Sequence, residues 1–353
     1  MKRIHYIVLV AILTVFSGCS ELVIDPTQQV PDMSRSYIFF NPLVNETIDS
    51  KATLVIGDKL PYDKDTAFGV LGYYNNTSLF GSAYSETNGI ARVYRPDNNQ
   101  LFQYDNLIFW LHPTATHDFY AFYPYQINGA IPTINSSNAI VYNQPSANDA
   151  TMVDLMTAKN STGKSTEVDL TFAHRLWALD VVITNSQTQG LDGSTAGNII
   201  TNPSLYIKSV KVHVDDFPTG GTIPLDGSIS TPNTATADYS YTVFTSADGQ
   251  EIKSSSATTD QTLYSKRYGS LLFIQGAALK YRLEITYVDS RGADKGTNTF
   301  YFPSQTSYQT SNVTFAEGKK YTLTVNKTND TFVVGTLSPT DWTDHPQIDH
   351  EFN

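Results

Sequence analysis

The sequence predicts an all-β fold of two domains, and three observations support this prediction. The chain has 353 residues, which is enough for about two domains with a full core in each. Charged residues make up only 16%, whereas Tyr (22) and Phe (18) are abundant. Gly, Pro, Asn, Ser and Thr interrupt the sequence about every ten residues, as in β-sandwiches. Since no long segment has a helical period, parallel sheets with crossover helices are not expected.

Residues 168–184 are the segment around which the rest of the chain is organised. Apolar residues alternate from Val168, and this period of two assigns His174 to the inward row and Arg175 to the outward row. At Trp177 the phase slips by one residue, which predicts a bulge or a sharp bend. We expect this strand at the centre of a sandwich, with both of its faces covered.

Residues 1–18 have the pattern of a secretory leader. Lys2 and Arg3 precede an apolar run at 7–16, which is too short to span a membrane. Cys19 follows small residues and is the only cysteine, so the chain can form no internal disulfide. Its position resembles a bacterial lipobox, which predicts lipidation at Cys19; the alternative is an ordinary signal peptide. The lipid would then be the only membrane anchor.

After the leader, the pattern predicts a tether at 19–36 and two domains, at 37–190 and 200–353. The boundary is placed in a polar, glycine-rich segment at 185–202. The strands expected in the first domain are 37–44, 68–74, 92–94, 107–110, 119–125, 152–157 and the segment 168–184. The strands expected in the second domain are 205–214, 240–244, 271–275, 279–288, 321–325 and 331–337.

The charge balance and the motifs exclude several classes of function. With a formal charge of −11, the chain has no basic surface for nucleic acid. Residues 158–165 resemble a phosphate-binding loop, but a period-two strand follows where that motif needs a helix. We therefore expect a hairpin loop there, and no nucleotide.

Candidate catalytic and metal-binding residues form no recognised pattern. His174 is expected to be a buried, hydrogen-bonded histidine. No serine-hydrolase or zinc-protease motif occurs, so we expect no enzyme activity, no metal and no cofactor. A pair of glycosidase carboxylates stays open, because any two acids can meet in a fold. The residues considered as metal ligands and set aside are His112, His117, His345, His350, Asp63 and Asp65.

Several segments, in order along both halves, resemble the fimbrillin family of Bacteroidales, the subunits of donor-strand (type V) pili. The matching segments are the leader through Cys19, Tyr37-Ile38-Phe39-Phe40, Ser50-Lys51-Ala52, Phe68 to Tyr74, Trp110, His117 to Pro124, Asp154-Leu155-Met156, Leu170 to Leu176, Gly318 to Leu323, and Trp342.

The resemblance implies two tandem transthyretin-like β-sandwich domains in an outer-membrane lipoprotein that is displayed on the cell surface or in a fimbrium. It also implies an outer-membrane protease that removes the first strand, and polymerisation with other fimbrial subunits by donor-strand exchange. The removable strand would contain Tyr37, Ile38, Phe39, Phe40, Leu43 and Val44. The candidate donor strand contains Thr331, Phe332, Val333, Val334, Gly335, Thr336 and Leu337.

One feature departs from the family pattern. The family commonly has Arg before the cut, whereas this chain has Lys51. Arg35 is available, but cleavage there would leave the first strand in place. The alternative is therefore a surface lipoprotein that does not polymerise, in a tip, anchor or adhesin role. Such a protein would bind a host or bacterial surface ligand, for example a glycan stacked on Tyr73 or Tyr120.

Overall fold

The computed structural model describes residues 37–44, 67–80, 89–94, 110–111, 114–127, 129–146, 152–191, 199–275, 280–288, 294–302, 315–335 and 337–341. Within these residues the chain consists of β-strands and one short helix, α1 (Gln261–Tyr264). The all-β prediction is therefore confirmed. None of the described segments forms a helix with the length and apolarity needed to cross a membrane.

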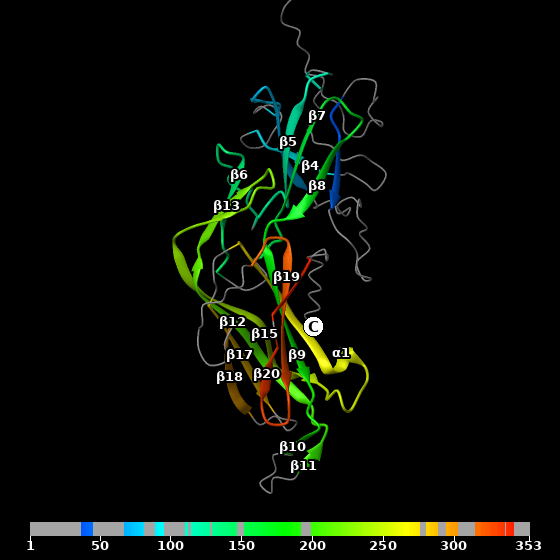
Figure 1. Ribbon diagram of the computed structural model, residues 1–353, viewed down its shortest axis with the longest axis vertical. Helices are drawn as coiled ribbons and strands as arrows, with labels where there is room; N and C mark the ends of the chain where they lie inside the picture. The colour runs from blue at the N-terminus through cyan, green and yellow to red at the C-terminus, as the bar shows by residue number, and fades with distance from the viewer. Residues whose placement is uncertain are drawn as a thin grey trace, which may run out of the picture. The chain divides into compact units, whose positions relative to one another are not determined.

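The N-terminal sheet has the strand order β1-β8-β7-β5-β2-β3, with β4 also paired to β2 (Figure 1). Its strands are β1 (Phe40–Val44), β2 (Phe68–Tyr74), β3 (Thr77–Ser78), β4 (Ala91–Val93), β5 (His117–Tyr123), β7 (Met156–Thr162) and β8 (Val168–His174). The turn between β2 and β3 has Asn75 and Asn76 at positive φ, a conformation that Asn adopts more readily than most residues.

The C-terminal part contains two larger sheets. One, which we call the β9 sheet, has the order β16-β9-β19-β20, with β21 also on β19. Its strands are β9 (Trp177–Asn185), β16 (Ser265–Phe273), β19 (Lys319–Lys327), β20 (Phe332–Val334) and β21 (Ser338–Asp341). The other, the β12 sheet, has the order β15-β12-β17-β18. Its strands are β12 (Leu205–Pro218), β15 (Thr236–Ile252), β17 (Lys280–Val288) and β18 (Asp294–Phe302).

Two small sheets complete the described part of the chain. In one of them, β6 pairs with β13 and β13 with β14; in the other, β10 pairs with β11. Their strands are β6 (Ala139–Asn143), β13 (Gly220–Pro224), β14 (Thr231–Pro232), β10 (Gln189–Leu191) and β11 (Ile199–Thr201). The pairing of β6 with β13 joins segments far apart in sequence, with Gly220 opposite Asn143.

The segment 168–184 bends where the sequence predicts, and the bend carries the chain from one sheet to another. β8 ends at His174 in the N-terminal sheet, and β9 begins at Trp177 in the β9 sheet. β8 alternates strictly between buried and exposed residues, so the expectation that both faces are covered is wrong for β8. The first five residues of β9 are all buried, as expected for a strand with both of its faces covered. The domain limits at 190 and 200 stay a prediction.

The buried side chains form two cores. The first lies on one face of the N-terminal sheet, where Phe40 of β1 packs with Phe68 and Phe172. The second includes Phe122, from the other face of that sheet, and continues to Trp177 and the residues between the β9 and β12 sheets. The inward row predicted for 279–288 is confirmed by the buried Tyr281, Leu283 and Ile285.

The segment that resembles a phosphate-binding loop is a strand followed by a turn. β7 extends to Thr162, further than the strand expected at 152–157, and β8 begins at Val168. β7 and β8 pair in antiparallel fashion, with Met156 opposite His174. No helix begins at Ser165, so the prediction of a hairpin is confirmed.

Candidate functional site

The candidate site is β1 together with the strand that receives it, β8. β1 is parallel to β8, with Phe40 opposite Val168, and it is the last strand in the order of the N-terminal sheet. The Val168 N–H donates to the Phe39 carbonyl at 2.8 Å, and the Asn41 amide donates to Asp169 Oδ1 at 2.7 Å. Pro42 lies inside β1, which fits a strand at the end of a sheet, because proline has no N–H for a second neighbour.

The side chains of β1 belong to the first core. Ile38 and Phe40 are completely buried. The Phe40 ring meets Phe119 edge to face at 5.6 Å and Phe68 at 6.4 Å between ring centroids. Burying one Ile and one Phe side chain stabilises the fold by about 3–6 kcal/mol of gross transfer energy. Phe39 is also buried, whereas Leu43 is only partly buried.

The candidate donor segment is at the edge of its own sheet. β20 pairs antiparallel with β19, and Phe332 is buried with its ring 5.1 Å from Tyr287 and 5.8 Å from Phe300. Val333 is 45% exposed. The Gly335 N–H donates to the Thr324 carbonyl at 2.7 Å. The segment therefore has one anchored ring and one outward apolar side chain.

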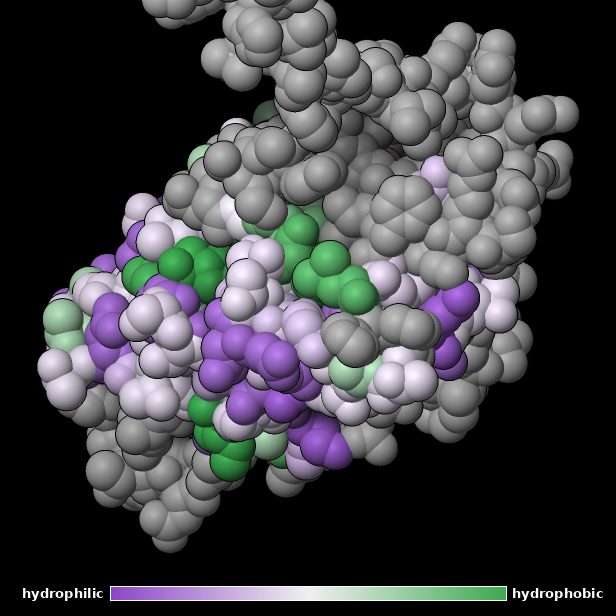
Figure 2. All heavy atoms as spheres, turned by 90° about the horizontal axis from the view of Figure 1, so that it is seen from above, coloured by the Kyte–Doolittle hydropathy of each residue, from purple (hydrophilic) through white to green (hydrophobic). Residues whose placement is uncertain are grey.

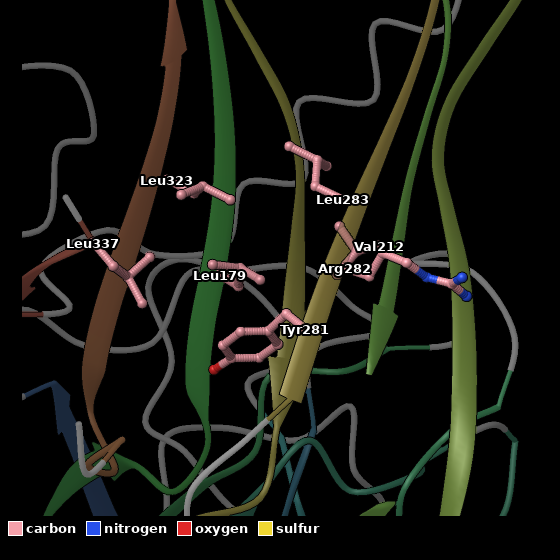
Figure 3. A pocket seen from close by; sticks show the side chains of 7 residues that line it. All are labelled: Leu179, Val212, Tyr281, Arg282, Leu283, Leu323 and Leu337. Carbon is pink, nitrogen blue, oxygen red and sulfur yellow. The ribbon is translucent and has the colours of Figure 1, made fainter. Parts of the chain in front are cut away.

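Leu337, at the end of that segment, lines an apolar pocket between the β9 and β12 sheets (Figure 3). Arg282 also lines the pocket, but its guanidinium points away from the leucines. The Tyr281 hydroxyl is buried at this pocket and has no hydrogen-bond partner among the described residues. The remaining lining residues are Leu179, Val212, Leu283 and Leu323.

Several predicted site residues lie outside the described residues, and the structure does not place them. These residues are Cys19, Arg35, Lys51 and Thr336. The same holds for residues set aside as metal ligands, namely Asp63, Asp65, His112, His345 and His350. In the part of the chain that is described, no group of three or more His, Cys, Asp or Glu residues could hold a metal ion.

The two described histidines of the sequence analysis are both core residues. His174 Nδ1 lies 2.9 Å from Asp154 Oδ1, and both residues are buried, so the prediction of a buried, hydrogen-bonded histidine is confirmed. His117 is buried between rings, with Tyr74 stacked at 5.1 Å and Trp110 edge-on at 5.0 Å.

The sequence analysis missed a buried cluster around Arg175, which the alternation assigned to the outward row. The Arg175 guanidinium lies 3.0 Å from Glu317 Oε2 and donates to the carbonyls of Gly227 and Ser228. The Ser230 N–H donates to Glu317 Oε1 at 2.8 Å. Burial lowers the pKa of Arg175, against the opposing effects of Glu317 and Asp226. Arg175 faces inward because it lies in the bend after β8, where the alternation of a strand no longer applies.

A second buried charge, Asp180, was also missed because it lies within an apolar strand. Asp180 is fully buried on β9, between β16 and β19. Its Oδ2 atom lies 3.3 Å from Arg267 Nε and 3.3 Å from Lys320 Nζ. A cation from each neighbouring strand thus compensates a carboxylate in the sheet.

The two tyrosines suggested for glycan stacking are neighbours, but they are half-buried rather than exposed. Tyr73 on β2 and Tyr120 on β5 meet edge to face at 6.0 Å. The Tyr73 hydroxyl donates to Asn138 Oδ1 at 2.8 Å. The exposed Lys159 ammonium lies 5.2 Å above the Tyr120 ring.

The remaining surface shows no large apolar patch among the described residues. On the face seen in Figure 2, apolar side chains form small groups separated by polar ones. The exposed large apolar residues of the described part are Leu111, Val141, Ile199, Ile229 and Val333. They come from different strands and turns, and none of them forms a candidate site by itself.

Comparisons with known proteins place the chain in a family. A family model described as fimbrillin-like matches residues 55–342. The fold is similar to that of a candidate cell adhesion protein from Bacteroides uniformis, at 18% identity and a TM-score of 0.52, covering 89% of this chain and 100% of that one.

Two further solved structures share this fold. A candidate cell adhesion protein from Bacteroides ovatus matches at 15% identity and a TM-score of 0.53, covering 88% of this chain and 99% of that one. A fimbrial protein from Bacteroides vulgatus matches at 14% identity and a TM-score of 0.50, covering 86% and 99%. None of the curated proteins compared matches the sequence. Because the family model spans most of the sequence, this chain belongs to the fimbrillin-like family.

Proposed function

We propose that this protein is an adhesive fimbrial subunit that joins its neighbours by donor-strand exchange at the site of β1. The observation that carries the proposal is the placement of β1, which ends the N-terminal sheet and buries Ile38 and Phe40 in its core. In this proposal the subunit is exported as a lipoprotein on Cys19 and acts at the outer membrane or in a fimbrium. Family membership and the fimbrial and cell adhesion descriptions of similar structures support this role.

The physical basis is strand addition to an open sheet. Removal of β1 would leave the main chain of β8 without the partner that Val168 now has. It would also leave the places of Ile38 and Phe40 empty next to Phe119 and Phe68. An incoming strand with apolar side chains at alternate positions restores both kinds of contact.

The proposed incoming strand is residues 331–337 of a neighbouring copy or of a related subunit. Its apolar residues at 332, 333 and 334 can supply one side chain or two to the vacated places, depending on register. Leaving its own sheet costs the burial of Phe332 between Tyr287 and Phe300. Because exchange replaces one buried aromatic by another, the burial gained in the neighbour offsets this cost.

Release of β1 requires a cut between β1 and β2, and Lys51 lies in that interval. A cut after Arg35 precedes β1 and would leave the strand in place. We therefore propose Lys51 as the residue whose cleavage by an outer-membrane protease activates the subunit.

Limited trypsin treatment of the purified chain tests this function, with electron microscopy to detect filaments and N-terminal sequencing to locate the cut. The same interval also contains Lys59 and Lys64, so the chain used for the test carries Lys59→Gln and Lys64→Gln, which leaves Lys51 as its one trypsin site between β1 and β2. We expect filaments after cleavage of this chain at Lys51, and no filaments when Lys51→Gln is added. Arg35→Gln is the matched control and should still assemble. If the chain trimmed after Lys51 stays monomeric at every concentration, the polymer role is wrong.

A second candidate function, a glycan-binding surface protein that does not polymerise, is supported by the Tyr73–Tyr120 pair with Lys159 above it. An aromatic ring beside an exposed ammonium and an amide suits the ring face and the hydroxyls of a sugar. A glycan array tests it. Binding should be lost in Tyr120→Ala and retained in Tyr206→Ala, a half-buried tyrosine of β12. Equal binding by both variants would remove this candidate.

A further inference from the structure

Two strand pairings in the described part of the chain are parallel, and both involve the segment β8–β9. β1 runs parallel to β8, with Phe40 opposite Val168, and β19 runs parallel to β9, with Lys320 opposite Ala178. The other pairings of the described strands are antiparallel. Only two residues separate the end of β8 from the start of β9.

The direction of a strand pair decides how it resists a pulling force. When two paired strands are pulled from opposite ends, they must slide past each other, and all of their hydrogen bonds bear the load together. When they are pulled from the same end, the bonds break one after another. In a parallel pair, the N-terminal end of one strand and the C-terminal end of the other lie at opposite ends of the pair.

We infer that residues 168–185 form a load-bearing spine, which carries tension through the subunit with both of its parallel pairings loaded in the sliding direction. This inference rests on the proposed strand exchange. A donor strand that takes the place and direction of β1 is pulled at its N-terminal end, since residues 328–330 connect it to β19 of its own subunit. β8 is pulled at its C-terminal end, through β9.

The same geometry recurs at the second pairing. β9 receives the load at its N-terminal end from β8, and β19 passes it on at its C-terminal end, which leads to the donor segment of that subunit. Each subunit in a filament would therefore repeat the sequence donor, β8, β9, β19 and donor. No antiparallel pair lies on this path.

Side chains reinforce the path at its joint and along β9. At the joint, Arg175 binds Glu317 and the carbonyls of two residues beyond β13. Near the start of the β9–β19 pair, Lys320 lies 3.3 Å from Asp180. Near its end, the Thr184 hydroxyl donates to Asn326 Oδ1 at 2.9 Å. These cross-links oppose sliding of β9 against β19.

Single-molecule pulling with cysteine handles tests the spine. For the β9–β19 pair, handles at Ala173→Cys and Asp330→Cys pull in the sliding direction, whereas Ala173→Cys with Lys319→Cys pulls both strands from the same end. These two chains carry Cys19→Ser. For the β1–β8 pair, the chain is produced without export, so that Cys19 keeps its thiol. Cys19 with Ala173→Cys then loads in the sliding direction, and Cys19 with Thr166→Cys pulls from the same end. Residues 166, 173 and 330 are exposed, and Lys319 is half-buried.

We expect each sliding geometry to survive the same constant load about 100-fold longer than its matched partner. This ratio corresponds to two to three hydrogen bonds of ~1 kcal/mol that bear the load together, at 1.36 kcal/mol per tenfold in rate. Equal lifetimes within either matched pair would overturn the inference for that pairing. If the Lys319→Cys chain does not fold, the two chains with handles on either side of the β1–β8 pair still test the inference for that pairing.

This test separates the inference from the proposed function. The handles pull on a single chain, so the lifetimes report strand direction whether or not filaments form. If the trimmed chain forms no filaments but the sliding geometries last longer, the polymer role fails and the mechanical anisotropy stands. If filaments form and the lifetimes are equal, the spine is wrong and the proposed function is untouched.

Discussion

The buried pair of Arg175 and Glu317 allows the sharpest test of the described structure. Their side chains are only 6% and 12% exposed, and the guanidinium also donates to two carbonyls beyond β13. Removing one member of a buried ion pair leaves an uncompensated charge and typically costs about 3–5 kcal/mol. We therefore expect Glu317→Gln to lower the free energy of unfolding by ~3 kcal/mol.

The assay is urea unfolding followed by tryptophan fluorescence, since Trp177 is buried next to the bend that holds Arg175. The matched control is Glu284→Gln. Glu284 is 26% exposed and lies 3.1 Å from His213 on the surface of the β12 sheet, so its loss should cost less than ~1 kcal/mol. The double variant Arg175→Met with Glu317→Gln should recover part of the loss, because no buried charge is then left alone.

A second test of the Arg175–Glu317 pair repeats the unfolding measurements at high ionic strength. Buried charges are screened far less than exposed ones, so the effect of Glu317→Gln should persist at high ionic strength. If Glu317→Gln costs no more than Glu284→Gln, or if its effect disappears in salt, Arg175 is not buried as described.

Three further predictions follow from buried polar groups. Tyr281→Phe should be neutral or stabilise the fold by ~1 kcal/mol in thermal unfolding, because its hydroxyl has no partner among the described residues. A marked loss would mean that the hydroxyl is bound. Asp180→Asn should destabilise the fold by ~2 kcal/mol in the same assay, since it removes the carboxylate between Arg267 and Lys320; an unchanged melting temperature would contradict this. Stability should also fall steeply above pH ~10, because burial raises the pKa of several core tyrosines and the unfolded chain then loses its protons first. Each such tyrosine adds ~1.4 kcal/mol per pH unit to the fall in the free energy of unfolding. In urea titrations at pH 9–11, this free energy should therefore fall less steeply with pH for Tyr268→Phe than for the unsubstituted chain, and equal slopes would refute the prediction. The tyrosines concerned are Tyr142, Tyr241, Tyr268 and Tyr281.

The strands that sequence predicted well are those with one buried face. The alternation from Val168 to His174 and the row from Tyr281 to Ile285 are confirmed, because burial of one face imposes a period of two. β13 and β18 were not expected. β13 is a short strand with two glycines, and β18 is the last strand of the β12 sheet and is rich in Thr and Asn, so neither has an alternating apolar row.

The missed parts of the site depend on contacts between distant residues, which local pattern does not contain. Arg175 meets Glu317 across more than a hundred residues of sequence, and Asp180 meets Arg267 and Lys320 on two neighbouring strands. The phase slip at Trp177 indicated the bend but not the direction of the side chains within it. The one sequence feature that could have indicated these contacts is a charged residue within an otherwise apolar strand segment, as in 175–180, because such a charge needs a partner when it is buried.

β1 is attached to the fold as a replaceable strand should be. It contributes the completely buried Ile38 and Phe40, and among the described residues it pairs with β8 over five positions. β9, by contrast, pairs over eight residues with β19 and eight with β16. Pro42 further removes one N–H from β1, so its main chain offers less than a regular strand would. In the proposed exchange, this attachment through apolar side chains would let another strand with suitable side chains replace β1 at little net cost.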